Sequence, residues 1–211
     1  LGVAVSGGDG VEFDGEGWIE ALTRDLMSSL ERSIVIAGDH QAPGVHALAH
    51  AINESLGNVG ATVFHTGPLQ PQPESQNESL AELVADMKGG EVDMLVILGG
   101  NPAYDAPADL DFAGAMSQVG TVTYLGTYIN ETSAHSHWHL PQSHYMESWG
   151  DARAYDGTAT VQQPLIEPLY SSRSALEITA ALNRQPGRST LELVREYWQA
   201  NSRATDFERF W

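Results

Sequence analysis

The stretch Met94-Leu95-Val96-Ile97-Leu98-Gly99-Gly100-Asn101-Pro102 points most directly to a fold class. Five consecutive apolar residues stop abruptly at two glycines, which is typical of a buried parallel strand that ends in a tight turn. Ligands of open α/β sheets bind beyond the carboxyl ends of the strands, and glycines let a ligand or another backbone come close there. The stretch therefore predicts an α/β domain with a nucleotide-type site after residue 98.

Similar patterns alternate on both sides of this stretch. Short apolar runs predict four strands, at residues 33–38, 61–65, 92–98 and 121–128. Apolar residues at helical spacing predict four helices around them, over residues 11–30, 43–56, 80–87 and 108–116. Because strands that alternate with helices form parallel sheets covered by helices, the predicted fold is a doubly wound, mostly parallel, Rossmann-like α/β sheet.

The alternation stops after residue 128. Residues 129–169 are rich in polar and aromatic residues and lack periodicity, which predicts an extended ordered loop. Helices are expected again over residues 175–182 and 191–197. We therefore divide the chain into an α/β domain of residues 1–170 and a C-terminal helical segment of residues 171–211. The missing initial Met suggests a piece of a longer protein.

Composition argues against several classes of partner. The 211 residues carry a net charge of −18, and Lys88 is the single lysine. Such a surface repels phosphate backbones, so we expect no nucleic-acid binding. An apolar run of about 18 residues does not occur, so we expect no direct membrane insertion. Without cysteine, the segment cannot hold a thiolate zinc site or an iron–sulfur cluster by itself.

A group of histidines is the most conspicuous candidate for metal chemistry. His135, His137 and His139 alternate, and His144 follows. On a strand, alternate residues share one face, so three imidazoles could converge on zinc or copper. No carboxylate has an evident ligand spacing, so we predict no metal site. A histidine metal-binding module remains the alternative, and the role of the group stays open.

Other candidates for catalysis are weak. Asp39-His40 could form an acid–base dyad, but a polar cap of the helix that Pro43 opens is favoured. Four acids of the loop could do acid–base work but need no special explanation in so acidic a chain: Glu131, Glu147, Asp151 and Asp156. Dinucleotide and hydrolase fingerprints are absent. We predict no catalytic residue in this segment.

Several short motifs follow one another in a recognisable order. They are Leu98-Gly99-Gly100-Asn101-Pro102, Asn130-Glu131-Thr132-Ser133-Ala134, His139-Leu140-Pro141 and Glu147-Ser148-Trp149-Gly150. The ordered set spans about residues 92–168 and resembles the molybdopterin oxidoreductase family of the dimethyl-sulfoxide-reductase type. If the pocket is occupied, the resemblance implies that a molybdopterin guanine dinucleotide would meet Gly99, Gly100, Asn101, Pro102, Asn130, Glu131 and Thr132.

A second set of motifs indicates one particular branch of this family. His144-Tyr145, Glu147-Ser148-Trp149-Gly150-Asp151 and Gln163-Pro164-Leu165-Ile166-Glu167-Pro168-Leu169-Tyr170 are similar to the large iron–sulfur subunit of alternative complex III. That complex is a bacterial respiratory assembly that oxidises quinol. The resemblance implies two partners, an iron–sulfur ferredoxin-like region elsewhere in the full protein and membrane quinol-oxidising subunits. It also implies a location on the periplasmic face of the cytoplasmic membrane and a molybdopterin-like region without the molybdenum cofactor.

The chain departs from active cofactor binders after Glu147. Those enzymes usually continue Gly-Thr and then Asn-x-Glu-Gly-Arg, whereas here the Asn and the Arg are missing and Asp151 and Asp156 add negative charge. Because the cofactor carries two pyrophosphates, we expect these changes to disfavour it in a dry site. The expected function is a structural, non-catalytic part of an oxidoreductase complex. The alternative is the cofactor-binding domain of an active bis-molybdopterin guanine dinucleotide oxidoreductase.

Overall fold

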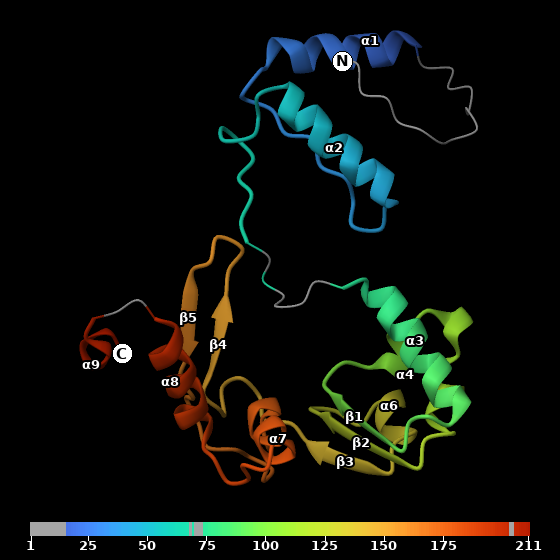
Figure 1. Ribbon diagram of the computed structural model, residues 1–211, viewed down its shortest axis with the longest axis vertical. Helices are drawn as coiled ribbons and strands as arrows, with labels where there is room; N and C mark the ends of the chain where they lie inside the picture. The colour runs from blue at the N-terminus through green and yellow to red at the C-terminus, as the bar shows by residue number, and fades with distance from the viewer. Residues whose placement is uncertain (1–15, 68, 70–73, 203–204) are drawn as a thin grey trace. The chain divides into compact units, whose positions relative to one another are not determined.

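A computed structural model describes residues 16–67, 69, 74–202 and 205–211 (Figure 1). They form a mixed α/β protein that contains a three-stranded parallel sheet, a two-stranded antiparallel sheet and helices. The chain divides into two compact units, residues 1–67 and 68–211, and the boundary expected after residue 170 falls inside the second unit. No helix in the described ranges has both the length and the apolar content that a membrane crossing requires.

The first unit contains two helices, α1 (Glu16–Ser28) and α2 (Pro43–Ser55). The predicted start of α1 at residue 11 lies outside the described residues. α2 begins at the proline, as predicted, because the fixed φ of proline suits the first helical turn. Residues 33–38 run beside α2 without forming a strand, and residues 61–65 contribute only a single bridge at Val63 (Figure 1). The structure thus differs from the two strands predicted here.

The side chain of Asn53 explains how residues 33–38 stay extended outside a ladder. Val35 N donates to Asn53 Oδ1 at 2.9 Å, and Asn53 Nδ2 donates to Val35 O at 2.7 Å. One buried amide therefore satisfies the donor and the acceptor that a neighbouring strand would otherwise satisfy.

The second unit is built on three parallel strands in the order β1-β2-β3. They are β1 (Met94–Leu98), β2 (Thr121–Gly126) and β3 (Trp138–Pro141). The first two confirm the predicted strands. The third lies in the segment predicted to be a loop, so that prediction is wrong here. As an edge strand of four residues, β3 has no long apolar run by which it could be recognised.

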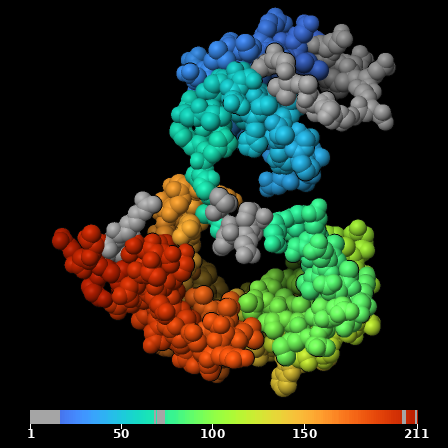
Figure 2. All heavy atoms as spheres, in the orientation of Figure 1, coloured from blue at the N-terminus to red at the C-terminus, as the bar shows by residue number. Residues whose placement is uncertain are grey.

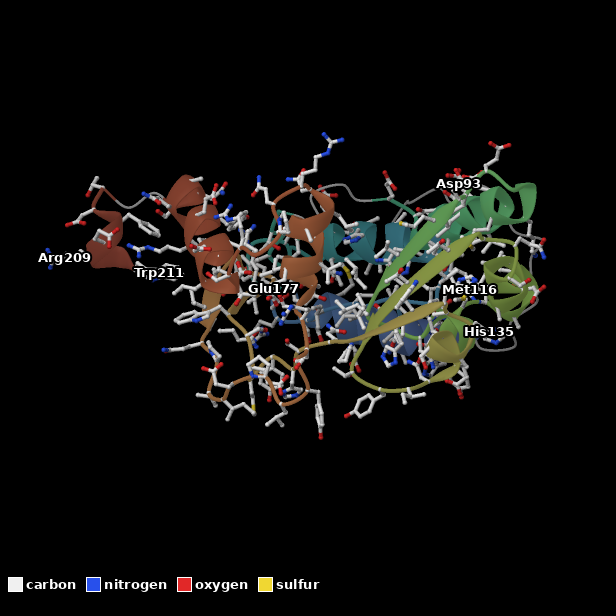
Figure 3. The ribbon with its side chains drawn as sticks, turned by 90° about the horizontal axis from the view of Figure 1, so that it is seen from below. Asp93, Met116, His135, Glu177, Arg209 and Trp211 are labelled. Carbon is white, nitrogen blue, oxygen red and sulfur yellow. The ribbon has the colours of Figure 1, made fainter. Side chains whose placement is uncertain are left out.

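The core lies between one face of this sheet and two helices, α3 (Gln76–Gly89) and α5 (Phe112–Met116). The parallel register places Leu95 beside Val122 and Ile97 beside Tyr124, on the same face. The helices contribute five buried residues, Val84, Met87, Phe112, Ala115 and Met116, the last of which is labelled in Figure 3. Each large apolar side chain buried in this way stabilises the fold by about 1.5–3 kcal/mol.

Two short elements lead from β1 to α5. They are α4 (Pro102–Asp105) and the 3₁₀ helix η1 (Ala108–Leu110). The helix predicted over residues 108–116 is therefore interrupted, and the interruption lies at Asp111, whose φ is 51°. Asp111 caps α5 by accepting a hydrogen bond from Gly114 N at 3.2 Å, so a polar side chain ends one helix and begins the next.

The opposite face of the parallel sheet carries apolar side chains that remain accessible. Met94, Leu98 and Trp138 are 59%, 43% and 65% exposed. The strand register places all three on the face away from the core, because alternate residues of a strand point to opposite sides.

The C-terminal part of the second unit contains a hairpin and three helices. They are β4 (Gly150–Arg153), β5 (Ala159–Gln162), α7 (Ala175–Leu182), α8 (Thr190–Asn201) and α9 (Phe207–Phe210). The two helices expected here are confirmed, and the atoms of α7 and α8 form one continuous surface (Figure 2). Ser174 and Ser189 begin them with capping boxes. The hairpin is a second departure from the loop predicted over residues 129–169.

Candidate functional site

The residues predicted to form a site meet at the carboxyl edge of the parallel sheet. Gly99 and Gly100 follow β1 with φ of 76° and 73°, a left-handed conformation that glycine adopts without steric cost. Asn130 precedes the short helix α6 (Glu131–Ala134), which follows β2. Because β1 and β2 are parallel neighbours, their two following turns lie side by side.

The side chain of Asn101 joins these two turns. Asn101 Oδ1 accepts hydrogen bonds from Thr132 N at 3.1 Å and from Thr132 Oγ1 at 2.8 Å. Thr132 Oγ1 in turn accepts a hydrogen bond from Ala103 N at 3.1 Å. On the other side, Asn101 Nδ2 donates to Glu131 Oε2 at 2.7 Å. Since Thr132 is 0% exposed, its bonds to Asn101 and Ala103 form a partly buried connection between the starts of α4 and α6, whereas the Asn101–Glu131 bond is exposed.

A buried tyrosine supports the same edge from the core side. Tyr124 of β2 donates from its hydroxyl to Gly100 O at 2.9 Å and accepts a hydrogen bond from Asn130 Nδ2 at 2.9 Å. Its ring stacks on His139 of β3, with centroids 5.2 Å apart. A Cβ on Gly126 would lie 2.2 Å from this ring, so only glycine fits there. Sequence reasoning missed Tyr124, although a Tyr two residues before a Gly in an apolar strand was the available signal.

Asn130 uses the rest of its polar groups to begin α6. Its Oδ1 accepts from Ser133 N at 3.0 Å, and its backbone N donates to Ser133 Oγ at 2.9 Å. Asn101, Asn130 and Thr132 are therefore all engaged within the protein. In the described part of the chain, every buried side-chain polar atom has a hydrogen-bond partner.

The electrostatics of the site are set by Glu131. The hydrogen bond from Asn101 lowers the pKa of this exposed carboxyl, so it is an anion at neutral pH. Within the described ranges, no Lys or Arg forms an ion pair with it. Arg173 is tied to the end of β3, because its backbone N donates to Pro141 O. Its guanidinium, however, donates to Ser172 O and lies 4.0 Å from the carboxylate of Glu177, so its charge is paired there and not with Glu131.

These residues do not fit a pyrophosphate-bearing cofactor. A phosphate against Gly99, Gly100 and Asn101 would face the carboxylate of Glu131, and like charges repel. The amide of Gly99 already donates to Leu125 O at 2.8 Å, which removes one donor from an anion. The positive φ values account for the two glycines without any ligand.

Two acids expected near the pocket lie elsewhere. Asp151 accepts a hydrogen bond from Trp198 Nε1 of α8 at 3.0 Å, and Asp156 accepts one from Thr158 N at 2.9 Å inside the β4–β5 turn. That second bond lowers the pKa of Asp156. The expectation that both acids charge the pocket is therefore wrong. Sequence proximity to the motif at Glu147 does not place them at the sheet edge, because the hairpin directs the chain toward α8.

The carboxylate of Glu147 organises a loop. It accepts from His144 N at 2.8 Å, from Leu169 N at 3.0 Å and from Ser172 Oγ at 3.4 Å. The backbone bond from His144 is the main cause of its lowered pKa. Glu147 thus fastens the segment before the hairpin to the segment after it.

The histidines of the β3 region bind backbone groups of β2. His137 Nδ1 accepts from Val122 N at 2.9 Å, and His139 Nε2 lies 3.1 Å from Gly126 O. His135 is exposed beside α6, as Figure 3 shows. Across the ranges that the structure describes, no three His, Asp or Glu side chains are placed to hold a metal.

Asp39 does not cap α2. The residue before Pro43 is Ala42, and α2 begins without a side-chain cap. The predicted cap is wrong because residues 39–42 form a turn of their own, in which Gln41 N donates to Gly38 O at 3.0 Å and Gln41 Nε2 lies 3.2 Å from His40 Nε2.

A groove of about 870 Å³ lies beside α7, α8 and β4. Its lining mixes apolar side chains of α7 and α8 with polar and charged ones, among them Asp151, Arg153 and Tyr197. The guanidinium of Arg153 lies 5.9 Å from the ring of Trp198, which anchors β4 to α8. No single sequence pattern signalled this groove, because three separate elements build it.

The fold and the site define a mixed α/β domain in which side-chain hydrogen bonds join the two turns at the carboxyl edge of the parallel sheet. Comparison of the chain with protein-family models and with curated proteins found no match.

Replacing Thr132 by valine tests the connection between the two turns. The change keeps the shape but removes the acceptor of Ala103 N and one of the two donors to Asn101 Oδ1, so we expect a loss of about 1–3 kcal/mol in the free energy of unfolding. Urea denaturation measures it. The matched control is Thr127→Val, an exposed position, for which we expect a change within about 0.5 kcal/mol. Equal effects of the two changes would contradict the buried connection.

The lowered pKa of Glu147 predicts a pH dependence. Because the folded-state pKa lies below the ordinary value of 4.5, the stabilisation is present above pH 4.5 and is lost as the pH falls below it. We expect hydrogen exchange of the Leu169 amide, corrected for its intrinsic rate, to accelerate in that acid range. Glu147→Gln should accelerate it already at pH 7, whereas Glu167→Gln should not. An unchanged Leu169 amide in Glu147→Gln refutes this role.

Proposed function

We propose that this chain is a structural domain of a respiratory electron-transfer complex that oxidises quinol, of the alternative complex III type. The domain would resemble molybdopterin oxidoreductases, bind no molybdenum cofactor and carry no catalytic step. The observation that supports this most strongly is the network of Asn101, Thr132 and Glu131. It occupies the polar groups that the family resemblance assigns to the cofactor.

The argument against a bound cofactor is electrostatic. Glu131 is ionised at the place where a pyrophosphate would lie, and its lowered pKa keeps it ionised to acidic pH. Displacing Asn101 from Glu131 and Thr132 would leave the buried Thr132 hydroxyl without its acceptor. A cofactor would have to offset both costs, and within the described residues no Lys or Arg forms an ion pair that neutralises Glu131.

A structural role requires surfaces that bind partners. Residues 165–170, held at Leu169 by Glu147, expose four large apolar side chains: Leu165, Ile166, Leu169 and Tyr170. A cluster of this kind on an ordered segment is typical of an interaction surface. We assign it to the iron–sulfur ferredoxin-like region and the membrane quinol-oxidising subunits, on the periplasmic face of the cytoplasmic membrane. Electrons would then pass through clusters outside this segment.

The alternative is the cofactor-binding domain of an active bis-molybdopterin guanine dinucleotide oxidoreductase. The two consecutive left-handed glycines at the sheet edge favour it, because a ligand could approach this backbone closely. It requires the Asn101–Glu131 bond to open and cations to come from other parts of the full protein.

We further propose that the three parallel strands belong to a doubly wound, Rossmann-like sheet. Its support is the accessible apolar face formed by Met94, Leu98 and Trp138. Parallel sheets are normally covered by helices on both faces, so we expect a second layer of helices over this face.

Metal analysis of the native complex tests the functional proposal. In full-length protein purified from membranes, we expect molybdenum far below one atom per chain by mass spectrometry, and no pterin fluorescence after oxidation. An active molybdenum enzyme prepared alongside is the positive control. Stoichiometric molybdenum would reject the proposal. Glu131→Gln adds a second readout: turnover per assembled complex should stay unchanged if the domain is structural.

Methionine oxidation tests the fold proposal, because Met94 lies on the face in question. In a doubly wound protein, peroxide should oxidise Met94 as slowly as the buried Met87 and Met116, relative to the rates in the urea-unfolded chain. Oxidation of Met94 at close to its unfolded rate, with Met87 and Met116 protected, would exclude a second layer over this face.

A further inference from the structure

The groove beside α7, α8 and β4 shares no residue with the sheet-edge site. α8 contacts both β4 and α7, so the three elements enclose one hollow (Figure 1). Ala180 and Val194 are buried at its base, whereas Leu176, Leu182 and Tyr197 of the lining remain exposed. The groove therefore combines a packed base with an apolar rim that water reaches.

Polar side chains are interspersed with the apolar ones of this lining. Thr179, Asn183 and Gln185 line the groove together with the leucines of α7 and α8. A purely apolar ligand would take water from these polar groups without replacing its hydrogen bonds, which costs free energy. A polypeptide offers apolar side chains and hydrogen-bonding groups together. The mixed lining thus favours a polypeptide as the occupant.

One cation lines the groove without an acidic partner. Arg153 Nη2 donates to Tyr197 Oη at 3.4 Å, and the guanidinium carbon of Arg153 lies 5.9 Å from the ring centroid of Trp198. These two contacts position the guanidinium, and no ion pair of the described residues includes Arg153. Because a guanidinium has five N–H donors, most of those of Arg153 stay open to a partner.

The charge around the groove differs from that of the rest of the chain. Residues 150–211 hold seven of the ten basic residues but only eight of the 28 acidic residues. Asp151, the carboxylate in the lining, already accepts a hydrogen bond from Trp198 Nε1 at 3.0 Å. An acidic partner is repelled by the remainder of the chain and meets the unpaired cation here, so charge complementarity selects this groove for it.

We propose that the groove docks an amphipathic helix of another polypeptide, whose apolar residues cover the leucines of the rim and whose Asp or Glu pairs with Arg153. α7 has eight residues and extends about 12 Å, which matches two turns of a partner helix with apolar anchors at positions i, i+4 and i+7. A third helix packed there would bury the accessible parts of Leu176 and Leu182, as helices do in bundles.

The acidic residue of the partner would set the register of the docked helix. A guanidinium and a carboxylate form two parallel hydrogen bonds, which adds geometric specificity to the attraction of the charges. The apolar contacts supply most of the affinity, since an exposed ion pair contributes little. The inference goes beyond the proposed function, because it holds whichever assembly contains the chain.

Selection from a displayed library of helical peptides with one randomised face tests the proposal, with the whole chain as the target. We expect enriched peptides to carry apolar residues at i, i+4 and i+7 and an Asp or Glu beside them, with micromolar dissociation constants. Selection on Arg153→Glu should enrich Lys or Arg at that position instead. Arg209→Glu changes the net charge equally at a residue outside the groove lining, so this matched control should still select acids.

Titration of one enriched peptide separates the two parts of the recognition. Replacing its acid by Gln should weaken binding to the wild type at least about threefold, but should not weaken binding to Arg153→Gln. Leu182→Ser should weaken binding of the original peptide at least about fivefold. Leu165→Ser, at an exposed leucine outside the groove lining, is the control and should leave the affinity unchanged. Urea midpoints verify folding, and Leu176→Ser replaces Leu182→Ser if that variant fails.

Several results would overturn the inference. One is a selection without enriched peptides. Another is an enriched acidic peptide that binds Arg153→Glu as tightly as the wild type, because its acid would then meet another part of the chain. A third is unchanged affinity in Leu182→Ser. Dodecanoate that binds the wild type but not Leu182→Ser, with no peptide enriched, would assign the groove to small amphiphiles and reject a helical partner.

Discussion

The hydrogen bonds of the Asn101 side chain are the constraint on which the carboxyl edge of the sheet depends. A single amide accepts two hydrogen bonds from Thr132 and donates one to Glu131, and so holds the turn after β1 against the helix after β2. Because Thr132 is buried, neither turn can move without leaving a polar group unpaired. At the edge that binds ligands in other α/β proteins, these side chains therefore bond to one another, and the exposed carboxylate of Glu131 is part of the network.

Packing in the core beneath this edge stabilises the same two turns. Tyr124 reaches from β2 to Gly100 O and to Asn130, and its ring requires a glycine at Gly126. The apolar face below it, packed by α3 and α5, fixes the position of the tyrosine ring. Packing in the core and hydrogen bonding at the edge therefore stabilise the same arrangement of the two turns.

Sequence patterns predicted the parts of the fold whose signal is continuous and local. β1, β2 and the helices α7 and α8 were readable because short apolar runs or apolar residues at helical spacing mark them. The family resemblance named Gly99–Pro102 and Asn130–Thr132 together, and the structure places both segments after neighbouring parallel strands. β3 was not readable, since a four-residue edge strand needs few apolar residues. Likewise, Asp39, Asp151 and Asp156 were misassigned because chain proximity does not determine the direction in which a turn or hairpin leads.

A double-mutant cycle on Asn101→Ala and Thr132→Val tests the central claim most directly. The free energy of unfolding of the wild type, the two single variants and the double variant gives the coupling between the two side chains. If they act as one buried connection, the cycle should yield a coupling of about 1–3 kcal/mol, with the second change costing little after the first. Additive losses within about 0.5 kcal/mol would show that the two side chains act independently, which contradicts a single connection between the turns.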